Sequence, residues 1–155
     1  MKVLNKVLIG VASVAMLTAC ASKTDYASFH SKAQEAAEKA KEVSYSKVVV
    51  SGSYIDDDGK KQEYNDVTVN FSKGSYGAGG LTNTTLEQAA VVLMLEASRA
   101  QVIGESENNT YYAGSSFKVV YEKDGKKETT LWNQYGLLTS VKSSDGDNLK
   151  VSYKK

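Results

Sequence analysis

The chemistry open to this chain is limited first by its thiol and imidazole groups. The 155 residues contain one cysteine, Cys20, and one histidine, His30. A single thiol cannot form an internal disulfide, and a zinc site built from cysteine and histidine needs more ligands than these two. His30 follows Phe29 in a stretch with helical periodicity, so we interpret it as a surface or boundary side chain. We therefore expect no metal site and no catalytic site that depends on a Cys-His pair or a serine triad.

Cys20 nevertheless stands in a context that gives it a specific chemistry. Lys2 and Lys6 form a basic start, and the eleven residues 7–17 are almost wholly apolar. A basic region followed by an apolar run of this length is typical of a secretory signal peptide. It is shorter than the roughly 20 apolar residues that a spanning helix needs. The run ends in Leu17-Thr18-Ala19-Cys20, which resembles the lipobox of bacterial lipoproteins.

This resemblance implies a processed and acylated N-terminus. Cleavage would fall between Ala19 and Cys20, and a diacylglycerol, with palmitate-like chains, would be attached to the Cys20 sulfur through a thioether. Two acyl chains anchor a protein stably where a single chain holds it only marginally. Residues 1–19 would then be the signal peptide, and residues 20–24 the lipidated cysteine and a short tether. The implied location is extracytoplasmic, on the bacterial cell membrane or the outer membrane.

The body of the chain has little net charge. Removing residues 1–19 takes Lys2 and Lys6 from the 19 basic residues and leaves 17 against 18 acidic ones. Such a balance provides no net attraction to nucleic acid, so we expect no nucleic-acid partner. The ordinary composition and length of residues 25–155 are typical of a single globular domain, and no motif points to a cofactor.

Two segments have the hydrophobic periodicity of helices. Residues 25–42 form an amphipathic pattern, with Asp25 as the expected N-terminal cap. Residues 85–103 are apolar over most of the helical circumference, so we expect a long helix that is largely buried. Two pairs at its start have the spacing of a capping box: Thr84 with Glu87, and Thr85 with Gln88.

The other segments alternate apolar and polar residues with a period of two, which indicates β-strands. A hairpin with its turn at Asp58-Gly59 joins strands near residues 48–54 and 65–71. A four-stranded antiparallel meander is expected over residues 111–153. We therefore predict an α+β domain over residues 25–155. In this domain an antiparallel sheet of about six strands, arranged as hairpins and a meander, packs on one long apolar helix, with the N-terminal amphipathic helix added.

Two loops partly match known ligand-binding motifs. Asp56-Asp57-Asp58-Gly59 has the acidic residues of half a calcium loop, but Tyr54 and Asn65 stand where the first ligand and the final glutamate belong. Residues 73–81 hold four glycines but lack the Gly-Lys-Ser/Thr ending of a P-loop. We interpret the first as a solvated hairpin tip. The second is expected to be a connector, with a lid over a pocket as the alternative.

The order of elements over residues 25–155 resembles that of two carrier families, the lipoprotein carriers of the LolA kind and the mycobacterial glycolipid carriers of the LppX kind. In those families a curved antiparallel sheet wraps a helix around an apolar cavity. The resemblance implies an apolar ligand between the sheet and the 85–103 helix. The residues that would line it are Leu93, Met94, Phe117 and Trp132. The alternative is that these four side chains pack in a solid core.

No combination of acid, base and nucleophile stands out, so we do not expect an enzyme. The sequence favours a lipid-anchored binding module for an apolar or small-molecule ligand. The alternative is a structural or interaction lipoprotein that holds an envelope protein at the membrane. A cavity of several hundred Å³ would favour the first function. An exposed apolar patch or an unprotected strand edge would favour the second.

Overall fold

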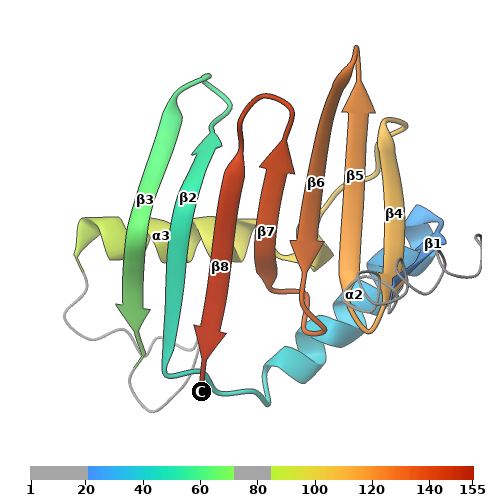
Figure 1. Cartoon of the computed structure of the whole chain (residues 1–155). Helices are drawn as coiled ribbons and strands as arrows, with labels where there is room; N and C mark the ends of the chain where they lie inside the picture. The colour runs from blue at the N-terminus through green and yellow to red at the C-terminus, as the bar shows by residue number, and fades with distance from the viewer. Residues whose placement is uncertain (1–20, 72–84) are drawn as a thin grey trace, which may run out of the picture.

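The computed structural model describes residues 21–71 and 85–155 (Figure 1). The described chain is an α+β fold with one antiparallel sheet that does not close on itself, in the order β1-β4-β5-β6-β7-β8-β2-β3. The lipobox cysteine and the glycine-rich segment 73–81 lie outside the described residues. The strands are β1 (Ala21–Thr24), β2 (Lys47–Ile55), β3 (Lys61–Asn70), β4 (Asn109–Gly114), β5 (Phe117–Lys123), β6 (Lys126–Trp132), β7 (Leu138–Ser143) and β8 (Asn148–Lys154).

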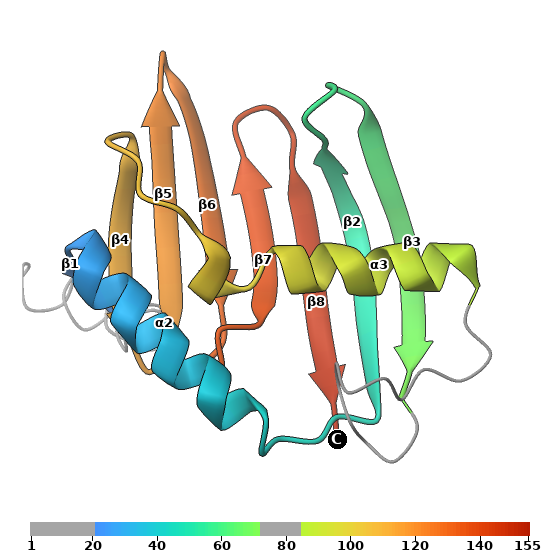
Figure 2. The same cartoon turned by 180° about the vertical axis from the view of Figure 1, so that it is seen from behind.

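The helices lie on one face of this sheet (Figure 2). They are α2 (Tyr26–Ala40), α3 (Leu86–Ala97) and the short 3-10 helix η2 (Ala100–Val102). The first, α2, runs obliquely over the end of the sheet that contains β4 and β5, while α3 crosses β7, β8, β2 and β3. Figure 1 shows the opposite face without a covering helix. The core is therefore a single layer of side chains between the sheet and the two helices.

Strand order follows from the turns. Strands β4 to β8 are joined by short turns and form a meander, because each strand pairs with the next in antiparallel register. The hairpin of β2 and β3 joins this meander through pairing of β2 with β8. The helix α2 connects β1, which pairs with β4 at one edge of the sheet, to β2, which lies next to the strand at the opposite edge.

The start of α2 has the cap that the sequence predicts. The Asp25 carboxylate accepts a hydrogen bond from the Ser28 backbone N–H at 2.7 Å, which satisfies one of the unpaired donors of the first turn. The buried side of the helix carries Phe29 and Ala33, both fully buried. The Phe29 ring lies 5.2 Å from the Tyr111 ring, between centroids, so α2 packs directly on β4.

The capping box of α3 is formed by the second of the two expected pairs. The Gln88 N–H donates to the Thr85 hydroxyl at 3.2 Å, and the Thr85 N–H donates to the Gln88 side-chain oxygen at 2.9 Å. The Gln88 amide nitrogen also donates to the Thr68 carbonyl oxygen at 2.9 Å, which fixes the beginning of α3 on β3. One side chain therefore defines both where the helix begins and where it lies on the sheet.

The expectation of a long, largely buried helix over residues 85–103 is met only in part. The helix α3 has 12 residues and is shorter than α2, which has 15. It ends because the chain turns to extended backbone at Arg99 before the turn of η2. Its outer side is exposed: Leu86 and Leu93 expose 92% and 70% of their surface. A helix that lies on one face of a single sheet can bury only one side, however apolar its sequence.

The sheet has eight strands among the described residues, not about six. The meander that was expected to have four strands has five, β4 to β8. The stretch from Tyr111 to Tyr121 belongs to two of them, β4 and β5, because the chain reverses where the Gly114 N–H donates to the Ser116 carbonyl oxygen at 3.0 Å. Residues 21–24, expected as a tether, form β1 and pair with β4, Ala21 opposite Gly114. The apolar-polar alternation continues through the Ser115-Ser116 bend, so the sequence pattern does not show that the chain reverses there.

Gly52 marks an irregularity in β2. Its φ is +100°, and the pairing with β3 shifts register between Val50 and Gly52. A Cβ atom at residue 52 would lie 1.8 Å from the Asn148 carbonyl oxygen of β8. Glycine is therefore required both by the backbone conformation and by the close approach of β8.

We expect Gly52→Ala to lower the free energy of unfolding by more than about 3 kcal/mol, or to prevent folding, because conformational strain and a clash act together. Gly59→Ala is the matched control. Gly59 also has a positive φ, +77°, but nothing lies within 4 Å of the position of its Cβ, so only strain of about 1–2 kcal/mol is expected. Urea unfolding followed by circular dichroism measures both losses. Equal losses would contradict the clash at residue 52.

Candidate ligand-binding pocket

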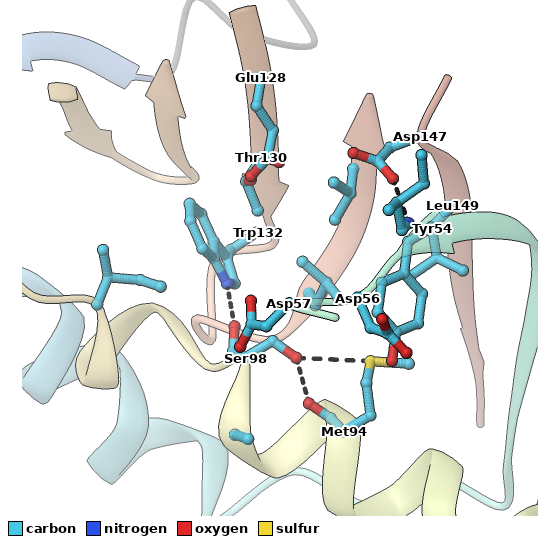
Figure 3. Close-up of a pocket in the computed structure, with 15 residues that line it drawn as sticks. Tyr54, Asp56, Asp57, Met94, Ser98, Glu128, Thr130, Trp132, Asp147 and Leu149 are labelled. Atoms are coloured by element: carbon cyan, nitrogen blue, oxygen red, sulfur yellow. Dashed lines mark hydrogen bonds between the residues drawn. The ribbon is translucent and has the colours of Figure 1, made fainter. Parts of the chain in front are cut away.

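A pocket of about 420 Å³ lies between α3 and the sheet, toward the turns that join β2 to β3 and β7 to β8 (Figure 3). Its volume falls in the range of small-molecule sites, about 300–1,000 Å³. The apolar part of its lining consists of Tyr54, Ile55, Met94, Ala97, Ile103, Trp132, Leu138, Val141 and Leu149. The polar part consists of Asp56, Asp57, Ser98, Glu128, Thr130 and Asp147.

The sheet side of the pocket is set by strand register. Thr130 of β6 lies opposite Val141 of β7, and Val141 lies opposite Leu149 of β8. Opposite residues of neighbouring strands point to the same face, so these three side chains form one row facing α3. Val141 and Leu149 are the apolar side chains of this row, and Thr130 adds a hydroxyl group on the β6 side.

Trp132 fixes the α3 side of the pocket. Its ring is 2% exposed, and its indole N–H donates to the Ser98 carbonyl oxygen at 2.6 Å. The Ser98 hydroxyl in turn donates to the Met94 carbonyl oxygen. These bonds satisfy polar groups at the C-terminal end of α3 and hold that end over β6.

The carboxylates among the lining residues differ in how they are bound. Asp56 is fully engaged by its own hairpin, because its side chain accepts hydrogen bonds from the Lys60 N–H at 2.9 Å and from the Gln62 amide at 2.7 Å. The bonds from Gln62 and Lys60 hold the pKa of Asp56 below its usual value. Asp57, by contrast, is exposed at the same hairpin tip, beside exposed Asp58. The expected hairpin tip is therefore present, and Asp56 stabilises it.

Asp147 is a buried carboxylate that joins two turns. It is 8% exposed, and its Oδ1 accepts a hydrogen bond from the Ile55 N–H at 2.6 Å. Its own N–H donates to the Ser143 hydroxyl at 3.1 Å. Within the described part of the chain its second oxygen, Oδ2, accepts no hydrogen bond. The carboxylate is thus held in one orientation with one oxygen left over (Figure 3).

Glu128 lies at the same end of the pocket as Asp147. It stands opposite Ser143 across β6 and β7, and Ser143 is the residue that holds the Asp147 backbone. Burial raises the pKa of the Glu128 carboxyl, and the negative charges of Asp147 and Asp145 raise it further, while a hydrogen bond with Thr130 acts in the opposite direction. The half-buried site therefore disfavours the ionised form of this side chain.

The structure brings together two of the four side chains expected to line a ligand site. Met94 and Trp132 line the pocket. Leu93 lies on the exposed outer side of α3. Phe117 is buried under α2, with its ring 5.7 Å from that of Phe29, and borders a separate pocket of about 170 Å³. Cys20 lies outside the described residues, so its lipidation stays a prediction.

Sequence reasoning missed Glu128 and Asp147. The sequence does contain a signal for Glu128. Residues 128 and 130 stand four and two positions before Trp132, so all three lie on one face of a strand. No local signal marks Asp147. Its position depends on a hydrogen bond to a residue 92 positions away in the sequence.

A wider depression of about 610 Å³ lies where α2 approaches η2, but it is a poorer candidate. Its lining is mostly exposed and polar: Ser31, Gln34, Glu35, Ala37, Glu38, Gln101 and Val102. A ligand there would bury little apolar surface. The pocket beside α3 has the mainly apolar lining with a few polar groups that is usual for ligand sites.

Two further observations concern the described residues only. No group of three or more His, Cys, Asp or Glu side chains among them is placed to hold a metal ion. None of the helices in residues 21–71 and 85–155 is both long enough and apolar enough to cross a membrane.

Comparison of the chain with protein-family models, with curated proteins and with solved structures gives no match. The geometry of the pocket and the sequence of the first twenty residues are therefore the features of this chain that bear on its function.

Glu128→Gln is expected to change the pH dependence of stability. Because the folded-state pKa of Glu128 is raised, the folded protein holds this proton more tightly than the unfolded chain, and wild-type stability falls as pH rises from the usual carboxyl range through the raised value. The glutamine variant lacks this loss, so its stability relative to wild type should improve between about pH 4 and pH 7. Urea midpoints across that range measure the change. Exposed Glu42→Gln is the control, and parallel curves for the two variants would refute the effect.

Proposed function

We propose that this chain is a membrane-anchored extracytoplasmic lipoprotein whose domain binds a small apolar molecule in the pocket beside α3. The pocket is the observation that carries the proposal. Most of its lining is apolar, with side chains from α3, β7 and β8. Three carboxylates, Asp56, Asp57 and Asp147, belong to the turns of the β2-β3 and β7-β8 hairpins, and Glu128 stands opposite Ser143 at the end of β7. Such a division suits a ligand with an apolar body and one polar end.

The proposed anchor would place the domain directly at the membrane. The lipobox-like residues end at Cys20, and β1 begins at the next residue, Ala21. No spacer would separate the acylated cysteine from the edge of the sheet. A molecule leaving the bilayer would therefore meet the domain without crossing a long stretch of water, which suits a protein that takes up apolar ligands.

Binding without catalysis is the function that the lining residues support best. Covalent or acid-base catalysis on a hydroxyl group needs a base within hydrogen-bond reach. The described lining offers no imidazole, amine or thiol, so its bases are carboxylates. The Ser98 hydroxyl donates to the Met94 carbonyl oxygen and not to one of them, and Glu128, which is hydrogen-bonded with Thr130, has no second polar partner among the described residues that would complete a catalytic triad. We therefore propose a carrier or receptor for its ligand, not an enzyme.

A second function, protein interaction, is favoured by the outer side of α3. Three apolar residues recur there at helical spacing and are exposed: Leu86, Ala90 and Leu93. The outer side of α2 is polar by comparison, with exposed Lys32, Glu35 and Lys39. An exposed apolar stripe on a helix is typical of a surface that binds another protein. A partner in the cell envelope is the alternative occupant that this stripe supports.

Replacing Cys20 tests the anchor. In a bacterial host with lipoprotein processing, we expect the wild-type chain to be recovered in the membrane fraction and to incorporate labelled palmitate. Cys20→Ala removes the sulfur that would carry the diacylglycerol, so the label should be lost. Cys20 is the only thiol in the sequence, so Ser22→Ala serves as the control for a nearby change. Palmitate labelling of Cys20→Ala at the wild-type level would contradict the anchor.

Narrowing the pocket mouth tests ligand binding. Ala97 lines the pocket, whereas Ala90 lies on the same helix, is also exposed and does not line it. We expect Ala97→Phe to weaken binding of the uncharged dye Nile red to residues 21–155 roughly tenfold, because the ring occupies the space of the dye. Ala90→Phe should leave the affinity unchanged. If Ala90→Phe has the larger effect, the dye binds the outer stripe of α3 and the interaction function is favoured.

A further inference from the structure

The polar end of the pocket is acidic without a basic counterpart. Four of its lining residues are aspartate or glutamate, and no described lining residue is lysine, arginine or histidine. The ion pairs found in the described chain join other residues and include neither Glu128 nor Asp147. A ligand that carries a positive charge would therefore complement the acidic end of the pocket.

We propose that the ligand of this pocket is an organic cation with an apolar body, its amine or quaternary ammonium group held between Glu128 and Asp147. This inference depends on the proposed function, because it names the chemical class of the molecule that the pocket binds. The apolar body would lie along Val141 and Leu149 toward Met94.

The position of Asp147 leaves one carboxylate oxygen able to bind a ligand. A carboxylate that is 8% exposed loses most of its hydration, which is unfavourable unless charge or hydrogen bonds replace the water. The Ile55 N–H supplies one hydrogen bond, to Oδ1. The other oxygen accepts no hydrogen bond from the described residues, and Figure 3 shows it on the side of Asp147 that faces Glu128 and Thr130. This oxygen is not one of the buried side-chain atoms that lack a hydrogen-bond partner, so it is open to the pocket and can contact a cationic ligand there.

Glu128 adds a second carboxylate at the same place. Its raised pKa reflects burial and the negative charges of Asp147 and Asp145, so the surroundings of Glu128 disfavour its ionised form. A cation between them would attract both and would favour ionisation of Glu128. The arrangement is unfavourable for the unliganded protein alone, and a bound positive charge offsets that.

An organic cation fits the pocket better than a metal ion. Calcium takes six to eight oxygen ligands, and no group of three or more acidic, histidine or cysteine side chains in the described chain is placed to hold a metal. Asp56 is engaged by Gln62 and the hairpin backbone. Most of the lining is apolar and includes Leu138, Val141 and Leu149. A hydrated metal ion would gain nothing from that surface, whereas the hydrocarbon part of an amphiphile would be buried against it.

The test compares two fluorescent probes that differ only in charge. Dansylcadaverine carries a primary amine that is protonated at pH 7, and its N-acetyl derivative has the same fluorophore and chain without the charge. The protein is residues 21–155, which contain every described strand and helix, and circular dichroism establishes that each variant is folded. We expect the amine to bind at least about tenfold more tightly than the amide at low salt, with the difference reduced by added salt.

The variants assign this preference to the pocket. Glu128→Gln and Asp147→Asn preserve shape, and asparagine retains the oxygen that accepts from Ile55. Each should reduce affinity for the amine roughly three- to tenfold and leave affinity for the amide unchanged. Glu42→Gln, at an exposed position after α2, is the control for charge and should change neither affinity.

The outcomes separate this inference from the proposed function. Equal binding of amine and amide, both weakened by Ala97→Phe, would overturn the cation inference and leave the pocket as a site for apolar ligands. No binding of either probe or of Nile red would overturn both. Retention of the amine preference in the Glu128→Gln/Asp147→Asn double variant would place the cation elsewhere and refute the assignment. Displacement of the amine by micromolar Ca²⁺ in wild type alone would make the carboxylate pair a metal site instead.

Discussion

The contacts of the Trp132 indole hold the two helical parts of this domain together. Its ring centroid lies 6.2 Å from that of Phe29 in α2, and its N–H donates to the Ser98 carbonyl oxygen at the end of α3. A single sheet with helices on one face can be stable only if both helices stay on that face, because the layer between them is the whole core. One strand residue thus contacts the buried side of α2, holds the end of α3 and forms a wall of the pocket.

The features predicted correctly from the sequence are those that depend on near neighbours. The Asp25 cap involves residues three apart, and the alternation of the later strands is a property of each strand alone. The short strand β1 could not be predicted, because Ala-Ser-Lys-Thr has no apolar alternation and becomes a strand through pairing with β4. The exposure of Leu93 was missed for a related reason. Periodicity shows that a helix is apolar on all sides but not how many layers will cover it.

The candidate site could be predicted less well than the fold because its parts come from distant segments. Trp132 and Met94 were identified as large apolar residues, which would serve equally in a core. The acidic end arises only when the turn before β8 meets the end of β2, where Asp147 accepts from Ile55. Such a hydrogen bond satisfies a backbone group as β2 ends, so a residue that completes the fold also defines the polarity of the pocket.

The pairing of β1 with β4 has a consequence for the order of events during maturation. Ala21, the first residue of β1, lies opposite Gly114, and under the proposed lipoprotein pathway it directly follows the cysteine to be acylated and cleaved. A processing enzyme that bound the chain on both sides of Cys20 would compete with β4 for this stretch. The edge of the sheet at β4 would therefore stay open until processing is finished, and β1 would be the last strand to join. Completion of the fold would then coincide with release of the signal peptide, so that an unprocessed chain retains an unpaired strand edge.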